Sequence, residues 1–268
     1  MEKPQLEKLC YSTRQLVAEV ASFIKKEVGK VETNTIEVKS KNSLVSYVDK
    51  TAEKRLVSGL QARLDGATFL TEEETVVASE GIYQWIIDPL DGTTNFLHAL
   101  PIFSISVALR FENQIIMGIV YEVNNNECFY AYKDGGAWLN DEKISVSPNS
   151  VFEDALIATG FPYYDFQYMD AYFGVLRNFV ERTRGIRRFG SAAIDMAYVA
   201  CGRFDGYFEY SLNAWDVAAG IILVEEAGGK VSDFKGESDY LFGKNIVVGS
   251  ESTHQVMMET IGKHFVKM

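Results

Sequence analysis

Apolar side chains recur at helical spacing in the first quarter of the chain. Between Leu6 and Ile24 they stand three or four positions apart, and Gly29 follows where such a helix would end. A second apolar stripe recurs every four residues from Val48 to Leu64. This pattern predicts an amphipathic opening helix and a second helix that begins near residue 47.

The hydrophobic period changes from helical to alternating in the middle of the chain. Apolar and polar positions alternate over 105–111, 115–121 and 127–132, and turn residues stand between these runs at 112–113 and 124–126. The runs predict an antiparallel meander. Gly135 and Gly136 mark a further turn before a short strand. The polar stretch 145–149 predicts a junction between an N-terminal half, 1–148, and a C-terminal half, 149–268.

The second half mixes short strands with helices. Strands are predicted near 155–159, 206–209 and 245–248, and helices over 171–180, 192–201 and 217–227, with a closing helix from about 253. The predicted fold class is α+β, with sheets that are covered by helices.

Composition narrows the class of protein. With 268 residues, of which 47% are hydrophobic, the chain can bury a large core. The three cysteines, at positions 10, 128 and 201, are widely spaced, which supports neither a disulfide framework nor a zinc site and fits a reducing compartment. We find neither a signal-peptide pattern nor an apolar run of membrane-spanning length. A cytoplasmic protein is therefore expected.

The net charge of −11, from 37 acidic and 26 basic residues, argues against binding to nucleic acid or to an anionic membrane. The same charge opposes a phosphate ester as substrate. Bound divalent cations would remove this conflict, because they are the largest local charges in such a site and reverse its electrostatics.

One stretch combines carboxylates with a glycine turn. The apolar run 85–87 leads directly into Asp88 and Asp91, which are followed by Gly92 and Thr93. We expect Pro89 to end the pairing of the strand and Gly92 to permit a tight turn. Carboxylate oxygens suit Mg²⁺, and backbone N–H groups at the turn suit a phosphate. Taken alone the motif could be only a turn, yet its length favours a metal-dependent phosphate site.

The stretch Asp88–Phe96, with His98 and Pro101 after it, resembles a signature of the inositol monophosphatase family of Mg²⁺-dependent, lithium-sensitive phosphatases. A second family signature is matched by Trp215–Gly220 and the later pair at 228–229. The resemblance extends over nearly the whole chain. It implies a layered αβαβα sandwich, two or three Mg²⁺ ions in each site, and a homodimer.

By this resemblance the metal ligands are the carboxylates of Asp88, Asp91, Asp216 and Glu72, with the backbone carbonyl of Leu90. From the residues alone, Asp216 could instead be the N-cap of the helix that follows it. The run at 71–74 could likewise be a solvated, acidic helix start, and a threonine replaces the glycine that the family usually has at position 71.

The resemblance also implies catalytic residues. Asp49, in the predicted second helix, and Thr93 would activate the attacking water, with Glu72 beside them. Asp49 could alternatively be an ordinary acid of a first helical turn. Phosphate is expected against Gly92 and Thr93, next to Leu90 and Asp91. Contacts to the substrate alcohol are expected from four positions in the second half. These are Gly190, Ser191, Ala192 and Glu209, with Asp216 nearby.

The resulting hypothesis is a phosphomonoesterase that hydrolyses myo-inositol monophosphate, or a similar polyol phosphate, by metal-activated water. Fructose-1,6-bisphosphatase, 3′(2′),5′-bisphosphate nucleotidase and histidinol-phosphatase remain open as alternatives, because their relatives share this scaffold. Glu209 and the short chain favour a small polyol. A non-catalytic binding protein is disfavoured, since the acidic ligands are all present.

Overall fold

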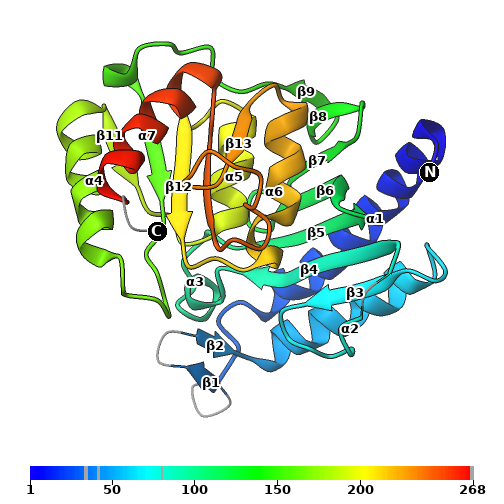
Figure 1. Ribbon diagram of the computed structural model, residues 1–268. Coiled ribbons are helices and arrows are strands. Elements are labelled where there is room, and N and C mark those ends of the chain that lie inside the picture. Colours follow the sequence, from blue (N-terminus) through cyan, green and yellow to red (C-terminus); the bar gives the residue numbers. More distant parts are fainter. Residues whose placement is uncertain (33–35, 41–42, 80, 266–268) are drawn as a thin grey trace.

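The computed structural model describes residues 1–265 apart from 33–35, 41–42 and 80. Its helices and sheets lie in five layers (Figure 1). Helices α1 (Lys3–Glu27) and α2 (Tyr47–Gln61) cover one face of a seven-stranded sheet, and α5 (Ala192–Ala200) and α6 (Ala214–Glu226) cover its other face. A five-stranded sheet follows, with α4 (Met169–Arg182) and α7 (Glu251–His264) outside it. The αβαβα prediction is confirmed.

The large sheet has the order β3-β4-β5-β6-β7-β8-β9. Only β3 and β4 run parallel among its neighbouring pairs, and the rest form the predicted antiparallel meander. Its strands have the following bounds: β3 Thr68–Thr71, β4 Tyr83–Asp91, β5 Ser104–Phe111, β6 Gln114–Glu122, β7 Glu127–Tyr132, β8 Gly136–Leu139 and β9 Glu142–Ile144.

Pro89 does not end β4, contrary to the sequence-based expectation. The strand continues to Asp91, and its pairing with β5 shifts: Asp88 faces Ser106, whereas Asp91, three residues later, faces Ser104. The chain advances by three residues on β4 and by only two on β5 between these pairs, so β4 contains a one-residue bulge. The bulge includes Pro89, which has no N–H to donate to the neighbouring strand. Side chains alternate along a strand, so the extra residue turns Asp91 to the same face as Asp88.

The layer between the sheets is apolar on all sides. Buried residues of α5 and α6 fill the space between β6 of the large sheet and the small sheet. Gly118 on β6 permits this packing, because a Cβ there would lie 2.6 Å from the backbone oxygen of Ala219 on α6. The two layers are therefore in direct backbone contact.

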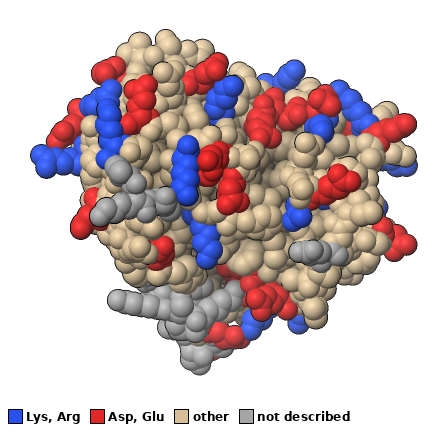
Figure 2. All heavy atoms as spheres, viewed as in Figure 1, with Lys and Arg blue, Asp and Glu red and all other residues tan. Residues whose placement is uncertain are grey.

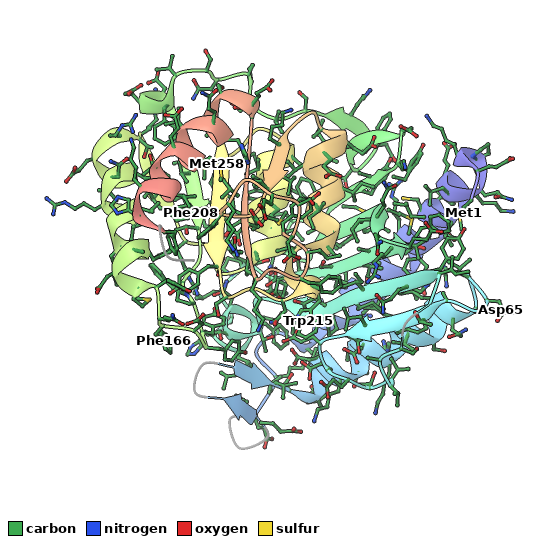
Figure 3. All side chains as sticks on the ribbon, viewed as in Figure 1. Met1, Asp65, Phe166, Phe208, Trp215 and Met258 are labelled. Carbon is green, nitrogen blue, oxygen red and sulfur yellow. The ribbon has the colours of Figure 1, made fainter. Side chains whose placement is uncertain are left out.

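The small sheet has the order β11-β10-β12-β14-β13. Strand β10 runs parallel to β11 and β12, and β14 runs antiparallel to β12 and β13. Aromatic side chains fill the core between this sheet and the outer helices α4 and α7, and Phe208 of β12 is among them (Figure 3). The bounds are β10 Leu156–Thr159, β11 Gly185–Arg187, β12 Gly206–Tyr210, β13 Lys230–Ser232 and β14 Asn245–Gly249.

Some boundaries differ from the sequence-based prediction. Helix α6 begins at Ala214, three residues earlier than expected, because Asn213 caps it. Several strands of three or four residues were not predicted at all, since so short a run carries no readable period. They are β1 (Glu37–Ser40), β2 (Ser43–Val45), β9, β11 and β13. The junction of the proposed halves, 148/149, stays a prediction.

Acidic and basic side chains lie interspersed on the face that Figure 2 shows. In the described part of the chain, no helix is both long and apolar enough to cross a membrane. A short helix, α3 (Thr93–Leu97), completes the set and directly follows β4.

Candidate active site

One pocket collects residues from elements that are distant in sequence. The end of β4, the start of α3, the segment before α5, the end of β12 and the start of α6 all line it. Trp215 marks the N-terminal end of α6 in Figure 3, on the lower side of the view where Phe166 also lies. The residues predicted for phosphate, metal and alcohol contacts come together here. Eleven of them line the pocket: Glu72, Asp88, Leu90, Asp91, Gly92, Thr93, Gly190, Ser191, Ala192, Glu209 and Asp216.

Asp88 is at the centre of the acidic group and is 2% exposed. Burial raises the pKa of Asp88 well above its usual value, and the charges of Glu72, Asp91 and Asp216 raise it further. Glu72 lines the same pocket, so its carboxyl group belongs to this acidic group. The structure thus brings together the four predicted acidic ligands.

Asp91 is held by the first turn of α5. Its Oδ2 accepts hydrogen bonds from the Ser191 hydroxyl at 2.6 Å and from the backbone N–H of Ala193 at 2.8 Å. Burial raises the pKa of Asp91 to about 6, although these two donors oppose the rise. Ser191 is also the N-cap of α5, so this helix start and the acidic group are fixed to each other.

Asp216 is the third residue of α6. It accepts a hydrogen bond at 2.7 Å from the backbone N–H of Asn213, which is the N-cap. The alternative that Asp216 is itself the N-cap is therefore wrong, but it does complete a capping box. Burial and the charge of Asp91 raise the pKa of Asp216 well above its usual value. Asp216 therefore stabilises the start of α6 and lines the pocket at the same time.

The acidic run at 71–74 is positioned by a residue that the sequence analysis did not single out. Glu53, fully buried on α2, accepts hydrogen bonds at 2.8 Å from the backbone N–H groups of Glu73 and Thr75. Thr71 pairs with Ile87 as a regular residue of β3, so its replacement of glycine leaves the strand intact. The signal that could have found Glu53 is its place one helical turn after Asp49.

The donor set fits a hard divalent cation. It consists of buried carboxylates together with the Leu90 carbonyl, and burial, followed by the charges of neighbouring acids, raises the pKa values of Asp88 and Asp216. Among the described residues, no three acidic, histidine or cysteine side chains enclose a point tightly enough to hold a metal by themselves. Mg²⁺ usually keeps several waters and takes substrate phosphate as a ligand, so an open set of this kind suits it.

Asp49 and Thr93 meet as the sequence analysis predicted. The Thr93 hydroxyl lies 3.1 Å from Asp49 Oδ1 and 2.9 Å from the Leu90 carbonyl oxygen. The other oxygen of Asp49 accepts hydrogen bonds from the backbone N–H and hydroxyl of Ser46, at 2.9 and 2.7 Å. Asp49 is therefore both a first-turn acid in a capping box and the partner of Thr93. Burial raises its pKa.

Gly92 is required where the chain turns from β4 into α3. Its φ of 90° is left-handed, and a Cβ would lie 3.0 Å from the Ile102 oxygen and 3.2 Å from the Gly190 oxygen. Asn95 holds the surrounding loops, because its side-chain amide donates to the carbonyls of Ile102 and Phe189 at 2.7 and 2.8 Å. The turn presents a glycine backbone beside the acidic group.

Glu209, near the end of β12, also lines the pocket. Its Oε2 accepts a hydrogen bond from the Tyr207 hydroxyl at 2.6 Å. Burial raises the pKa of Glu209 to about 7, although Tyr207 and the charge of Arg188 oppose the rise. Gly160 packs against this carboxylate so closely that a Cβ would lie 2.0 Å from Oε2. A larger residue at 160 would displace Glu209.

Arg188, Asp195 and Tyr163 also line the pocket, and the sequence analysis missed them. Two signals in the sequence could have found Arg188 and Asp195. The basic pair 187–188 stands shortly before the small-residue segment 190–193, and Asp195 is an acid within the apolar helix that follows. The side chain of Lys39 lies outside the described residues.

Comparisons with known proteins agree with this geometry. The model of the inositol monophosphatase family matches residues 5–267. An inositol-1-monophosphatase of Mesorhizobium japonicum is 37% identical over 93% of this chain and 94% of its own length. A protein of Pseudomonas aeruginosa named Nus factor SuhB is 37% identical over 90% of this chain and 91% of its own.

Solved structures give the same result. Extragenic suppressor protein suhB from Bartonella henselae superposes with a TM-score of 0.88 at 38% identity, covering 93% of this chain and 96% of that one. An IMPase from Thermotoga maritima superposes with a TM-score of 0.87 at 32% identity, covering 97% and 99%. With its fold, its acidic pocket and both signatures matched, the chain belongs to the inositol monophosphatase family and is a phosphoric monoester hydrolase.

Proposed function

We propose that this protein hydrolyses myo-inositol monophosphate, or a similar polyol phosphate, to the free polyol and phosphate in a Mg²⁺-dependent reaction. The observation that carries the proposal is the grouping of Glu72, Asp88, Asp91 and Asp216 in one pocket that Glu209 also lines. The acidic group can bind metal ions and, through them, the phosphate. The carboxyl group of Glu209 can accept hydrogen bonds from the hydroxyl groups of an alcohol.

Two or three Mg²⁺ ions would be held by these four carboxylates and the Leu90 carbonyl. When bound, they supply the positive charge that attracts the phosphate and polarises a water molecule. This explains how a chain with a net charge of −11 accepts an anionic substrate.

Thr93 and Asp49 orient the attacking water. The Thr93 hydroxyl has one proton, which it donates to Asp49 or to the Leu90 carbonyl, so its lone pairs remain to accept a hydrogen bond from water. Asp49 is fixed in turn by Ser46. A water held in one orientation next to the phosphate needs little further ordering to reach the transition state.

The phosphate lies against Gly92 and Thr93, where the absence of a Cβ lets an anion approach the backbone. In the same pocket, Glu209 accepts hydrogen bonds from hydroxyl groups of the alcohol. The small residues Gly190–Ala192 leave room for a polyol ring. The protein is further proposed to act in the cytoplasm as a homodimer.

Phosphate release from inositol 1-phosphate, with and without Mg²⁺, tests the proposal. Wild-type protein should release phosphate only with Mg²⁺, and Asp91→Asn should lose at least 100-fold in kcat because it removes a ligand charge. The matched control is Asp170→Asn, an exposed aspartate on α4. Full activity of Asp91→Asn would overturn the metal assignment. Preference for a bisphosphorylated sugar or nucleotide, or for histidinol phosphate, would select one of the rival activities.

A further inference from the structure

Asp195 on α5 is a buried carboxyl group that the proposed reaction does not use. It is 1% exposed, lines the pocket, and its Oδ1 has no hydrogen-bond partner among the described residues. A buried carboxyl oxygen without a partner is rare because its lost hydration is not replaced. Its environment therefore points to a group that enters the pocket or to a charge within it.

Arg188 supplies that charge. It is the one Lys or Arg among the described residues that line the pocket, and it lies at the mouth, where its guanidinium donates a hydrogen bond to the Tyr163 hydroxyl at 2.8 Å. Gly190 leaves the space for it, because a Cβ there would lie 2.7 Å from its terminal nitrogen. The side chain thus lies beside the glycine turn that takes the phosphate.

Two carboxyl groups, those of Glu209 and Asp195, line the same pocket as Arg188. Burial raises the pKa of both, and the charge of Arg188 opposes the rise. Arg188 is therefore the positive charge that partly offsets the burial of these two acids. A ligand that takes the guanidinium away leaves at least one buried carboxyl group without its counter-charge, which is unfavourable.

We propose that Arg188 and Asp195 are specificity-determining residues of this phosphatase site, which bind a neutral polyhydroxy alcohol and reject one that carries a second phosphate. Arg188 donates hydrogen bonds to hydroxyl groups of the alcohol next to Glu209. A second phosphate competes with Asp195 and Glu209 for the same guanidinium and would leave these two buried acids without their counter-charge. The inference rests on the proposed phosphatase function, and it adds the chemical rule by which the alcohol is selected.

Three substrates separate the two halves of the site. Phenyl phosphate has a leaving group without alcohol hydroxyls and tests only the metal and phosphate half. Inositol 1-phosphate adds neutral hydroxyl groups, and fructose 1,6-bisphosphate adds a second phosphate. Wild-type protein should favour inositol 1-phosphate over the bisphosphate in kcat/KM.

Asp195→Asn keeps the shape of the side chain and removes its charge. We expect the kcat/KM ratio of inositol 1-phosphate to the bisphosphate to fall about tenfold, mainly through a lower KM for the bisphosphate, with phenyl phosphate changed less than about twofold. Arg188→Gln should raise KM for inositol 1-phosphate about tenfold with kcat nearly unchanged. Asp170→Asn is the exposed control and should match wild type.

Equal effects of each variant on all three substrates would overturn the proposal, because a merely structural role lowers every activity together. Calorimetric titration of inositol 1-phosphate and of the bisphosphate, with Ca²⁺ in place of Mg²⁺, gives a second measurement. The ratio of their Kd values should shift tenfold in Asp195→Asn. If wild-type protein hydrolyses none of the three, the proposed function fails, and the calorimetric ratio still decides whether Arg188 and Asp195 select the ligand.

Discussion

The hydroxyl of Thr93 lies 3.1 Å from Asp49 Oδ1 and joins the first turns of two helices, α3 and α2, whose residues are 44 positions apart. This bond sets the direction of the hydroxyl lone pairs. A water molecule near the phosphate can therefore be oriented by a side chain that is itself fixed.

Removing this hydroxyl tests its part in the reaction. Thr93→Val should lower kcat about 10²- to 10⁴-fold, because the water loses its acceptor, whereas Thr93→Ser keeps the hydroxyl and should stay within about tenfold of wild type. Steady-state kinetics with inositol 1-phosphate measure both. Equal losses in the two variants would show that the methyl group of Thr93, and not its hydroxyl, matters.

Metal binding should be visible as a change in stability. Mg²⁺ that binds only the folded protein raises the melting temperature, and it also relieves the repulsion among the acids around Asp88. Asp88→Asn removes one ligand and part of that repulsion. The metal-free variant should therefore melt above metal-free wild type, and Mg²⁺ should raise its melting temperature less. Thermal scans at several Mg²⁺ concentrations measure this, and an undiminished Mg²⁺ effect would contradict the assignment.

Glu209 should make the metal-free protein less stable as pH rises. Its pKa is raised from 4.5 to about 7, mainly by burial, so the folded protein binds this proton more tightly than the unfolded chain does. The associated stability is complete below pH 4.5 and is lost as pH rises through 7. Glu209→Gln removes this loss and keeps an acceptor for Tyr207.

Urea unfolding at pH 5 and pH 8 measures the effect. The free energy of unfolding of Glu209→Gln, relative to wild type, should increase by about 1–3 kcal/mol between the two conditions. Glu153→Gln, at an exposed position, is the control. If the difference in the free energy of unfolding between Glu209→Gln and wild type is the same at both pH values, the pKa of Glu209 is not raised by burial.

The contact between the two inner layers predicts a sharp difference between two glycines. Gly118→Ala would place a Cβ 2.6 Å from the Ala219 oxygen and 2.9 Å from its Cα, which are backbone atoms and cannot move aside. We expect a loss of about 1–3 kcal/mol in the free energy of unfolding. Gly262→Ala, on α7 with open space around it, should instead gain about 0.5–1 kcal/mol. Chemical denaturation of both variants compares them, and a neutral Gly118→Ala would refute the close packing.

Most of the long elements could be predicted from the sequence, because helices such as α1 and the strands of the meander bury one face along a readable period. Predictions were weakest for strands of three or four residues and for helix starts. The start of α6 was placed too late because its first turn is fixed by the capping residue Asn213 and not by its apolar stripe.

The sequence by itself determined the chemistry of this protein. Acids at 88, 91 and 216 and the glycine turn at 92 are local signals, and their residue types are those that hard metal ions and anions favour in proteins. Tertiary structure decided how they act together. The bulge at Pro89 puts Asp91 on the same face as Asp88, Glu53 accepts hydrogen bonds from the backbone of the acidic run, and Arg188, Asp195 and Glu209 come to line one pocket. Bulges, buried supports and charge balance depend on which distant segments pack together, and no local pattern encodes that.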